Sequence, residues 1–185
     1  MDEGLILRAA SADDAGAIAA IYGDACLNGS GTFEEILPGP AAMAERLDAI
    51  LARGLPYYVA ELDGQVAGYA YASPFRPRTG YRYTAEDSVY IAPWAKGQGL
   101  GRALLAPVIA DCERLGLRQL MAVIGGSENA ASIALHRSLG FELKGVMTGV
   151  GFKLGRWMDI VMMQKALNGG VETLPEGPGL PLGGG

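Results

Sequence analysis

Three alternating glycines, in Lys96-Gly97-Gln98-Gly99-Leu100-Gly101, stand between a β-type run and a helical pattern. The β-type run is Val89-Tyr90-Ile91, and apolar residues recur at helical spacing from Leu104 to Leu115. Glycine lets the backbone approach a ligand closely and adopt positive φ angles. The free N–H groups at a helix start, with the positive end of its dipole, favour anions. The segment therefore predicts a cradle for a phosphate or pyrophosphate group.

The spacing of these glycines excludes two familiar phosphate motifs. No glycine is followed by Lys-Ser or Lys-Thr, as a P-loop requires. A dinucleotide fingerprint also fails, because its third glycine position holds Arg102 counted from Gly97 and Leu104 counted from Gly99. An ordinary glycine-rich turn between strand and helix stays open as the alternative.

A second segment, Asn129 to Phe141, follows a β-like run at 120–124 and predicts a short helix that ends at Gly140. It contains His136, the only histidine of the chain. Together the glycine loop and the pattern Leu135-His136-x-x-x-Gly140-Phe141 resemble the GNAT superfamily of N-acetyltransferases. The resemblance covers residues 4 to 166 and implies acetyl-coenzyme A as co-substrate.

Two further segments resemble one group within that superfamily, the phosphinothricin and methionine sulfoximine acetyltransferases. The first runs from Arg78 through Tyr81 to Glu86, and the second is the Gly-Phe-Lys-x-Gly-x-Trp-x-Asp pattern at 151–159. This resemblance implies a small amino-acid-like amine as acceptor and a homodimer as the working form. The pattern at 151–159 contributes Lys153, Trp157 and Asp159 to the pocket or to a dimer contact, with Trp157 expected to pack.

The resemblance also implies which residues hold the coenzyme. These are the strand before the loop, the loop itself and the start of the second helix: Val89, Tyr90, Ile91, Lys96, Gly97, Gln98, Gly99, Leu100, Gly101, Arg102, Asn129 and Ser132. For Asn129 a helix N-cap is an alternative that does not exclude the first.

Acyl transfer to an amine needs a base, because only a neutral amine attacks a thioester. We expect Glu86 to be that base, although a lone Glu is usually a solvated surface residue. His136 can donate a proton or orient another group near neutral pH, against the alternative of a structural histidine. We expect Arg78 and Tyr81 to bind the acceptor, since guanidinium pairs with a carboxylate or phosphinate in a bidentate way. The alternative for Arg78 is a charge that only solubilises the loop.

Composition limits the other function classes. The chain has 185 residues, half of them hydrophobic, which suits one domain with a sizeable core. Its net charge is −5 and no run of Lys or Arg stands out, so we expect no nucleic-acid partner. No apolar run reaches membrane-spanning length, and the first residues lack the pattern of a signal peptide. We therefore expect a cytoplasmic protein that binds no membrane and no metal, with Cys26 and Cys112 as buried free thiols.

Patterning predicts an α/β fold with a mixed central sheet and helices on both faces, as in the GNAT fold. Strands are expected at 5–8, 57–62, 66–71, 86–91, 119–124, 146–152 and 159–163, with Asp63-Gly64 as a hairpin turn. A helix with an apolar stripe over Ile18 to Ala25 and a second over 41–53 complete the pattern. Residues 1–167 are expected to form the domain, and the Gly/Pro-rich residues 168–185 a flexible tail.

Three functions remain open at this point. The first is transfer of acetyl to phosphinothricin, methionine sulfoximine or methionine sulfone. The second keeps the chemistry and changes the acceptor to a polyamine, an aminoglycoside or a protein N-terminus. The third is a non-catalytic module that binds acyl-coenzyme A, and the presence of both Glu86 and His136 counts against it.

Overall fold

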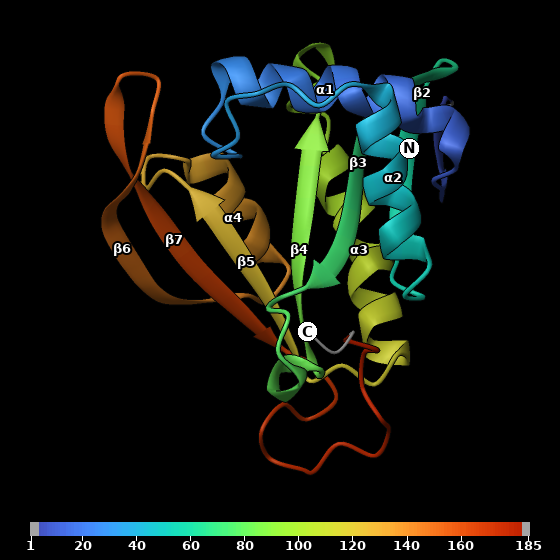
Figure 1. Ribbon diagram of the computed structural model, residues 1–185, viewed down its shortest axis with the longest axis vertical. Coiled ribbons are helices and arrows are strands. Elements are labelled where there is room, and N and C mark those ends of the chain that lie inside the picture. Colours follow the sequence, from blue (N-terminus) through green and yellow to red (C-terminus); the bar gives the residue numbers. More distant parts are fainter. Residues whose placement is uncertain (1–3, 183–185) are drawn as a thin grey trace.

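The computed structural model describes residues 4–182, and Figure 1 shows them arranged around one twisted sheet. Its seven strands lie in the order β1-β2-β3-β4-β5-β7-β6. Their bounds are β1 Leu5–Ala9, β2 Tyr57–Leu62, β3 Gln65–Pro74, β4 Thr84–Ile91, β5 Gln119–Gly125, β6 Glu142–Lys153 and β7 Arg156–Ala166. Only β4 and β5 pair in parallel, and the other neighbours are antiparallel. The mixed sheet is therefore confirmed.

Four α-helices cover the sheet, two on each face (Figure 1). Their bounds are α1 Ala15–Asn28, α2 Pro40–Leu51, α3 Leu100–Arg114 and α4 Ala130–Ser138. Helices α1 and α2 lie on the face where Tyr22 of α1 meets Tyr90 of β4 edge to face. Helices α3 and α4 lie on the opposite face, where Leu104 approaches Gly68 of β3. Helices on both faces are thus confirmed as well.

Strands β4 and β5 separate soon after they meet. They pair from Thr84↔Gln119 to Asp87↔Ala122 and no further. Beyond that point β4 stays with β3 and β5 stays with β7, so the two halves of the sheet diverge. Figure 1 shows the resulting gap between the two arrowheads. A sheet that opens in this way exposes backbone groups of β4 that would otherwise pair with β5.

Side chains alternate between the two faces of β4. Tyr90 lies on the α1 side, with its ring stacked on Tyr69 at 5.2 Å, so Ser88 and Glu86 share that side. Asp87 lies on the other side, where it contacts His136 of α4. Two adjacent acidic residues therefore face different environments.

The last two strands are longer than their sequence pattern indicates. We expected strands at 146–152 and 159–163, whereas β6 and β7 form a hairpin from Glu142 to Ala166. Antiparallel pairing with β5 and β6 extends β7 past its apolar run. Strand β6 carries two register shifts, between Leu143 and Gly145 and between Met147 and Gly151. These irregularities interrupt the alternation from which strand ends are read.

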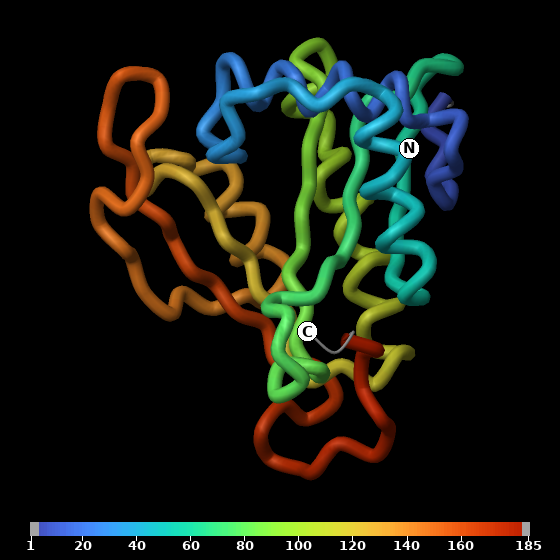
Figure 2. Tube along the Cα trace, viewed as in Figure 1, coloured from blue at the N-terminus to red at the C-terminus, as the bar shows by residue number. Residues whose placement is uncertain are grey.

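The segment after Leu167 lies along the base of the domain, as the red trace in Figure 2 shows. The Asn168 amide donates to the carbonyls of Glu113 and Leu117, and the Tyr83 hydroxyl donates to Gly177 O at 2.5 Å. Leu180 is buried and its N–H donates to Arg82 O. These contacts tie the segment to the C-terminal end of α3 and to the approach to β4. The domain boundary at 167 and the mobility of the tail stay predictions.

Candidate active site

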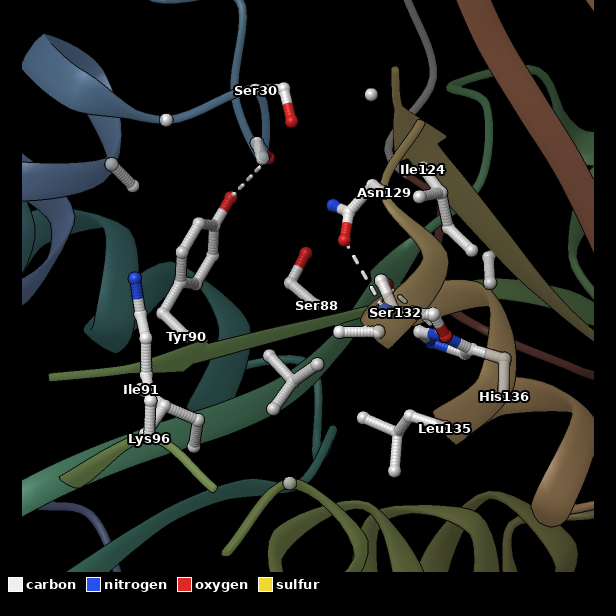
Figure 3. Close-up of a pocket in the computed structure, with 18 of the residues that line it drawn as sticks. Ser30, Ser88, Tyr90, Ile91, Lys96, Ile124, Asn129, Ser132, Leu135 and His136 are labelled. Atoms are coloured by element: carbon white, nitrogen blue, oxygen red, sulfur yellow. Dashed lines mark hydrogen bonds between the residues drawn. The ribbon is translucent and has the colours of Figure 1, made fainter. Parts of the chain in front are cut away.

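A cavity of about 940 Å³ occupies the gap between β4 and β5 (Figure 3). Its walls come from the C-terminal end of α1 and the residues after it, from β4, from the glycine loop, from β5 and α4, and from the turn between β6 and β7. Val89, Tyr90, Ile91, Lys96, Gly97, Gly99, Gly101, Arg102, Asn129, Ser132 and His136, all expected at the site, line it. Gln98, Leu100, Glu86, Arg78 and Tyr81 do not line this cavity. The fold therefore brings together most of the residues selected from the sequence.

The three glycines of the loop have two different physical roles. Gly97 and Gly99 have φ angles of 80° and 78°, a left-handed conformation that side chains rarely adopt. Gly99 is the N-cap of α3, so the unpaired N–H groups of the first turn follow it. Gly101 is needed for packing, because a Cβ there would lie 2.8 Å from Leu135 Cδ2 of α4. The loop thus presents a helix N-terminus to the cavity while keeping α3 and α4 close.

Two residues at the start of α3, Leu100 and Arg102, have side chains that are used for packing and for anchoring α4. Leu100 is buried in the core under the first turn of α3. The Arg102 guanidinium donates to Ser138 O at 3.1 Å and Ser138 Oγ at 3.0 Å, which anchors it to the end of α4. Lys96 is also exposed at the cavity, and its side chain has no hydrogen bond or ion pair to the described residues. A phosphate there would meet the Lys96 ammonium and backbone N–H groups.

Asn129 is the N-cap of α4, as one of the two alternatives predicted. Its Oδ1 accepts from Ser132 N at 3.2 Å, and Figure 3 shows the contact as a dashed line. The same residue lines the cavity. Its side-chain amide nitrogen can therefore serve a ligand while the oxygen caps the helix.

His136 is held by two acceptors. Its side chain is 3% exposed, with Nε2 2.9 Å from Asp87 Oδ2 and Nδ1 2.8 Å from Ser132 O. Both partners can only accept when Asp87 is ionised, so both ring nitrogens must carry protons. Burial lowers the pKa of His136, but the hydrogen bond and charge of Asp87 together with Ser132 O outweigh it, so the pKa is raised. The geometry favours an imidazolium paired with a buried carboxylate.

Asp87 was not selected from the sequence. Its side chain is 1% exposed, and its Oδ1 has no hydrogen-bond partner among the described residues. The signal for it was the adjacent acidic pair Glu86-Asp87 in a β-type run, since alternation sends the second carboxylate to the α4 face. Ser30 and Ser88 were missed too; Figure 3 shows both hydroxyls directed into the cavity from opposite walls.

Glu86 lies on the other face of β4, opposite Ser73 of β3 and Met121 of β5. Burial raises the pKa of its carboxyl to about 7, with Arg76 opposing the shift and Asp87 adding to it. No hydrogen bond to its carboxylate is formed by the described residues. A carboxylate with this pKa can accept or release a proton near neutral pH.

Arg78 and Tyr81 lie in the loop before β4, outside the cavity. Tyr81 is 44% exposed and packs edge to face on Phe75 at 5.8 Å, and Arg78 is exposed. Arg76 lies close enough to Glu86 to influence its pKa, and its guanidinium stacks on the Phe75 ring at 4.3 Å. We expected Arg78 to act near the base. In the structure, Arg76 is the arginine whose charge lowers the pKa of Glu86.

In the segment at 151–159 some side chains are buried and others are exposed. Lys153 is buried, and Asp159 accepts from Ser127 Oγ and from Gly149 N, which lies at the irregularity of β6 between Met147 and Gly151. Trp157 is 69% exposed, and Phe152 is the one aromatic ring of residues 4–182 that it meets, edge to face, so the expectation that it packs is wrong within one chain. Trp157 lies next to the turn of the hairpin, where its partner on the edge strand β6 is Phe152, itself exposed.

The two cysteines are buried free thiols, as predicted. Burial raises the pKa of Cys26, and raises that of Cys112 to about 12. Across residues 4–182 no group of three or more His, Cys, Asp or Glu side chains is arranged to hold a metal ion. None of the helices in this part of the chain is long and apolar enough to cross a membrane.

Comparison with known proteins agrees with this site. A model of the acetyltransferase (GNAT) family matches residues 29–141, from the end of α1 through α4. A phosphinothricin N-acetyltransferase of Alcaligenes faecalis is 52% identical over 170 residues, which cover 92% of this chain and 86% of the relative. The chain belongs to the GNAT acetyltransferase family.

A further relative and a solved structure are each similar to this acetyltransferase over most of its length. An L-methionine sulfoximine/L-methionine sulfone acetyltransferase of Salmonella typhimurium is 39% identical over 164 residues, 89% of this chain and 95% of the relative. The crystal structure of a GNAT superfamily phosphinothricin acetyltransferase from Sinorhizobium meliloti, in complex with AcCoA, superposes with a TM-score of 0.91. It is 49% identical and 96% of each chain is covered. The whole sheet and its helices, and not only the glycine loop, are therefore those of the family.

Proposed function

We propose that this acetyltransferase transfers the acetyl group of acetyl-coenzyme A to the amino group of a small amino-acid-like acceptor. Phosphinothricin, methionine sulfoximine and methionine sulfone are the acceptors we expect. The observation that carries this proposal is the 52% identity to a phosphinothricin N-acetyltransferase over 92% of the chain. Its 39% identity to a methionine sulfoximine/methionine sulfone acetyltransferase supports the same acceptor class.

The coenzyme is proposed to bind from the α3 and α4 side of β4. Its pyrophosphate would meet the N–H groups of Gly97 to Gly101, the first turn of α3 and Lys96. Its pantetheine arm would follow the unpaired edge of β4 at Val89 to Ile91, with Asn129 and Ser132 on the other wall. Where β4 has left β5, its backbone N–H groups are free to stabilise the oxyanion of the tetrahedral intermediate.

Proton transfer is proposed to use Glu86 and His136. Glu86 takes a proton from the acceptor ammonium, directly or through water, and the neutral nitrogen attacks the thioester carbonyl. The intermediate collapses as the C–S bond breaks, which leaves the amide and the coenzyme thiolate. His136, paired with Asp87, lines the cavity on the α4 wall, along the proposed path of the pantetheine arm. We assign to it the proton that the thiolate gains.

The acceptor carboxylate is proposed to bind the arginine loop before β4. Arg78 and Tyr81 come from the resemblance, and Arg76 comes from its influence on Glu86. A guanidinium beside Glu86 would place the carboxylate of an amino acid close to the base that deprotonates its amine.

We also propose that the enzyme is a homodimer that works in the cytoplasm. The outer strands expose large apolar side chains: Leu143, Val146, Met147, Val150, Phe152 and Trp157. An exposed apolar face of this kind usually marks an interface, and a two-fold axis lets one face cover its copy. Two free, buried thiols suit a reducing compartment. Light scattering should give twice the chain mass, and Val150→Lys should halve it; a wild-type mass of one chain would refute the dimer.

The function is tested by thiol release from acetyl-coenzyme A against a panel of amines. The panel contains methionine sulfoximine, methionine sulfone, phosphinothricin, ordinary amino acids, spermidine, an aminoglycoside and a peptide with a free N-terminus. We expect turnover with the first three and a raised acceptor KM in Arg76→Ala and Arg78→Ala. Turnover confined to the cationic amines or the peptide would refute the acceptor class, and coenzyme binding without any turnover would refute catalysis.

A further inference from the structure

Lys153 is a buried ammonium with only carbonyl partners. It is the last residue of β6 and is 1% exposed. Its Nζ donates to Thr32 O at 2.7 Å, Gly29 O at 2.9 Å and Ala25 O at 3.0 Å. An ammonium has three N–H donors, so all of them are used. Within residues 4–182 Lys153 takes part in no ion pair.

The three carbonyls belong to one short stretch of chain. Ala25 lies in the last turn of α1, Gly29 is the residue that ends that helix, and Thr32 lies beyond it. Carbonyls at a helix C-terminus lack intrahelical partners and form the negative end of the dipole. They therefore match a positive charge without a carboxylate. Lys153 thus ties both ends of the segment 29–32 to the tip of the β6–β7 hairpin.

The same segment is held against β4, β5 and β6 at very close range. The Tyr90 hydroxyl of β4 donates to Gly31 O at 3.2 Å. A Cβ at Gly125 of β5 would lie 1.9 Å from Ser30 O, and one at Gly151 of β6 would lie 2.0 Å from a ring atom of Phe33. Gly125 therefore requires glycine because the clash is with backbone, whereas a side chain at Gly151 would have to move the Phe33 ring. The segment spans the gap where β4 and β5 diverge, with Lys153 as its only charged anchor among the described residues.

This segment forms the cavity wall on the Glu86 side of β4. Gly29, Ser30 and Gly31 line the cavity, and Figure 3 shows the Ser30 hydroxyl facing that of Ser88 across it. Ser88 shares its face of β4 with Glu86, whereas α3 and α4 lie on the other face. Movement of the segment would therefore change the acceptor side of the cavity more than the coenzyme side.

We infer that Lys153 is a positioning residue for the transfer reaction: its buried ammonium fixes segment 29–32 and so shapes the acceptor side of the cavity. It does this through three backbone carbonyls and without contact with the acceptor. The inference rests on the proposed function for the identity of the acceptor side. The contact between ammonium and loop does not depend on that function.

The test is Lys153→Met, which keeps length and burial and removes the charge and all three donors. We expect the KM for methionine sulfoximine to rise about tenfold or more, the scale of lost charged hydrogen bonds, while the KM for acetyl-coenzyme A stays within about twofold. Without substrate, hydrogen exchange over residues 25–33 should become faster. Lys144→Met, on the same strand but exposed and paired with Glu142, is the matched control and should change neither.

A second variant reaches the segment without touching the ammonium. Gly151→Ala places a methyl group against the ring of Phe33, the residue directly after the segment, so it should push the segment through Phe33 and raise the acceptor KM in the same way. This variant decides the matter if Lys153→Met does not fold.

Three results would overturn the inference. They are unchanged exchange over 25–33 in Lys153→Met, equal changes in both KM values, or a displaced segment in Gly151→Ala with an unchanged acceptor KM. Wild-type protein that acetylates no amine of the panel would instead refute the proposed function, while the exchange result would still test the contact.

Discussion

Replacing Glu86 with Gln should lower activity and raise stability at the same time. The carboxyl is desolvated on β4 without a hydrogen-bond donor among the described residues, and burial raises its pKa from 4.5 to about 7. Ionising it in the folded protein is therefore unfavourable relative to the unfolded chain. Glutamine is nearly isosteric and never ionises, so it removes that cost together with the base.

The magnitude follows from the two pKa values. A raised pKa means that the group is stabilising while it is protonated, and that this stability is lost as pH rises from 4.5 through 7. The difference of 2.5 pKa units corresponds to about 3 kcal/mol at pH 8, at 1.36 kcal/mol per unit. Solvent at this half-buried site reduces the effect, so about 3 kcal/mol is an upper limit. At pH 4 the two proteins should have equal stability.

Activity should change in the opposite direction. A general base contributes roughly 10²- to 10⁴-fold, so kcat of Glu86→Gln should fall by at least about 100-fold. In wild type, kcat at saturating acceptor and coenzyme should fall about tenfold between pH 8 and pH 6, because the base becomes protonated around pH 7. In Glu86→Gln this decrease of kcat at low pH should be absent.

The assay combines thermal unfolding at pH 4 and pH 8 with thiol-release kinetics from pH 5.5 to 9. Glu142→Gln is the control, because Glu142 is exposed and paired with Lys144. Glu86 would be refuted as the base if Glu86→Gln kept kcat within threefold of wild type and still lost activity as the pH fell through 7. Equal stability of both proteins at pH 8 would refute the buried, unpaired state of the carboxylate.

Two other substitutions test the neighbouring parts of the site. Asp87→Asn leaves His136 without its counter-charge, and we expect a loss of about 3 kcal/mol in unfolding free energy at pH 6. Because the pKa of His136 is raised, this pair stabilises below the histidine's unfolded pKa and stops doing so as pH rises through its folded pKa. The loss measured by denaturant unfolding should therefore shrink at pH 9; a constant loss would contradict the imidazolium. Gly99→Ala forces a side chain to φ 78°, at a cost of about 1 kcal/mol, and should raise the KM for acetyl-coenzyme A but not for the acceptor. Equal KM changes would contradict the loop's role.

The parts of the fold that depend on local sequence could be predicted. The strand, glycine loop and helix at 86–114 follow from a β-type run, left-handed glycines and helical periodicity within thirty residues. The Asp63-Gly64 turn joins β2 and β3 as expected, with Asp63 itself at positive φ. Each of these features depends on residues that are close together in the sequence.

Features that depend on contacts between residues far apart in the chain could not be predicted from local sequence patterns. Gly125 and Gly151 look like ordinary strand glycines, yet each makes room for a segment about 95 to 120 positions earlier in the chain. Lys153 looks like a surface lysine until its three carbonyl partners are known. For Arg78 the sequence allowed either a role in acceptor binding or an exposed charge, and the structure shows it exposed and outside the cavity lining.

The two faces of β4 would let one strand serve both of the proton transfers that we propose. Glu86 and Asp87 are consecutive, so β alternation alone places one carboxylate toward α1 and the other toward α4. Burial of the first carboxylate, to which no group of residues 4–182 donates, favours its protonated form up to about pH 7, while the second is paired with His136. Strand pairing with β5 ends at Asp87, directly after both residues. The sheet therefore opens at the point where the two environments come closest, and an acyl group held in that opening can meet a base on one face and an imidazolium on the other.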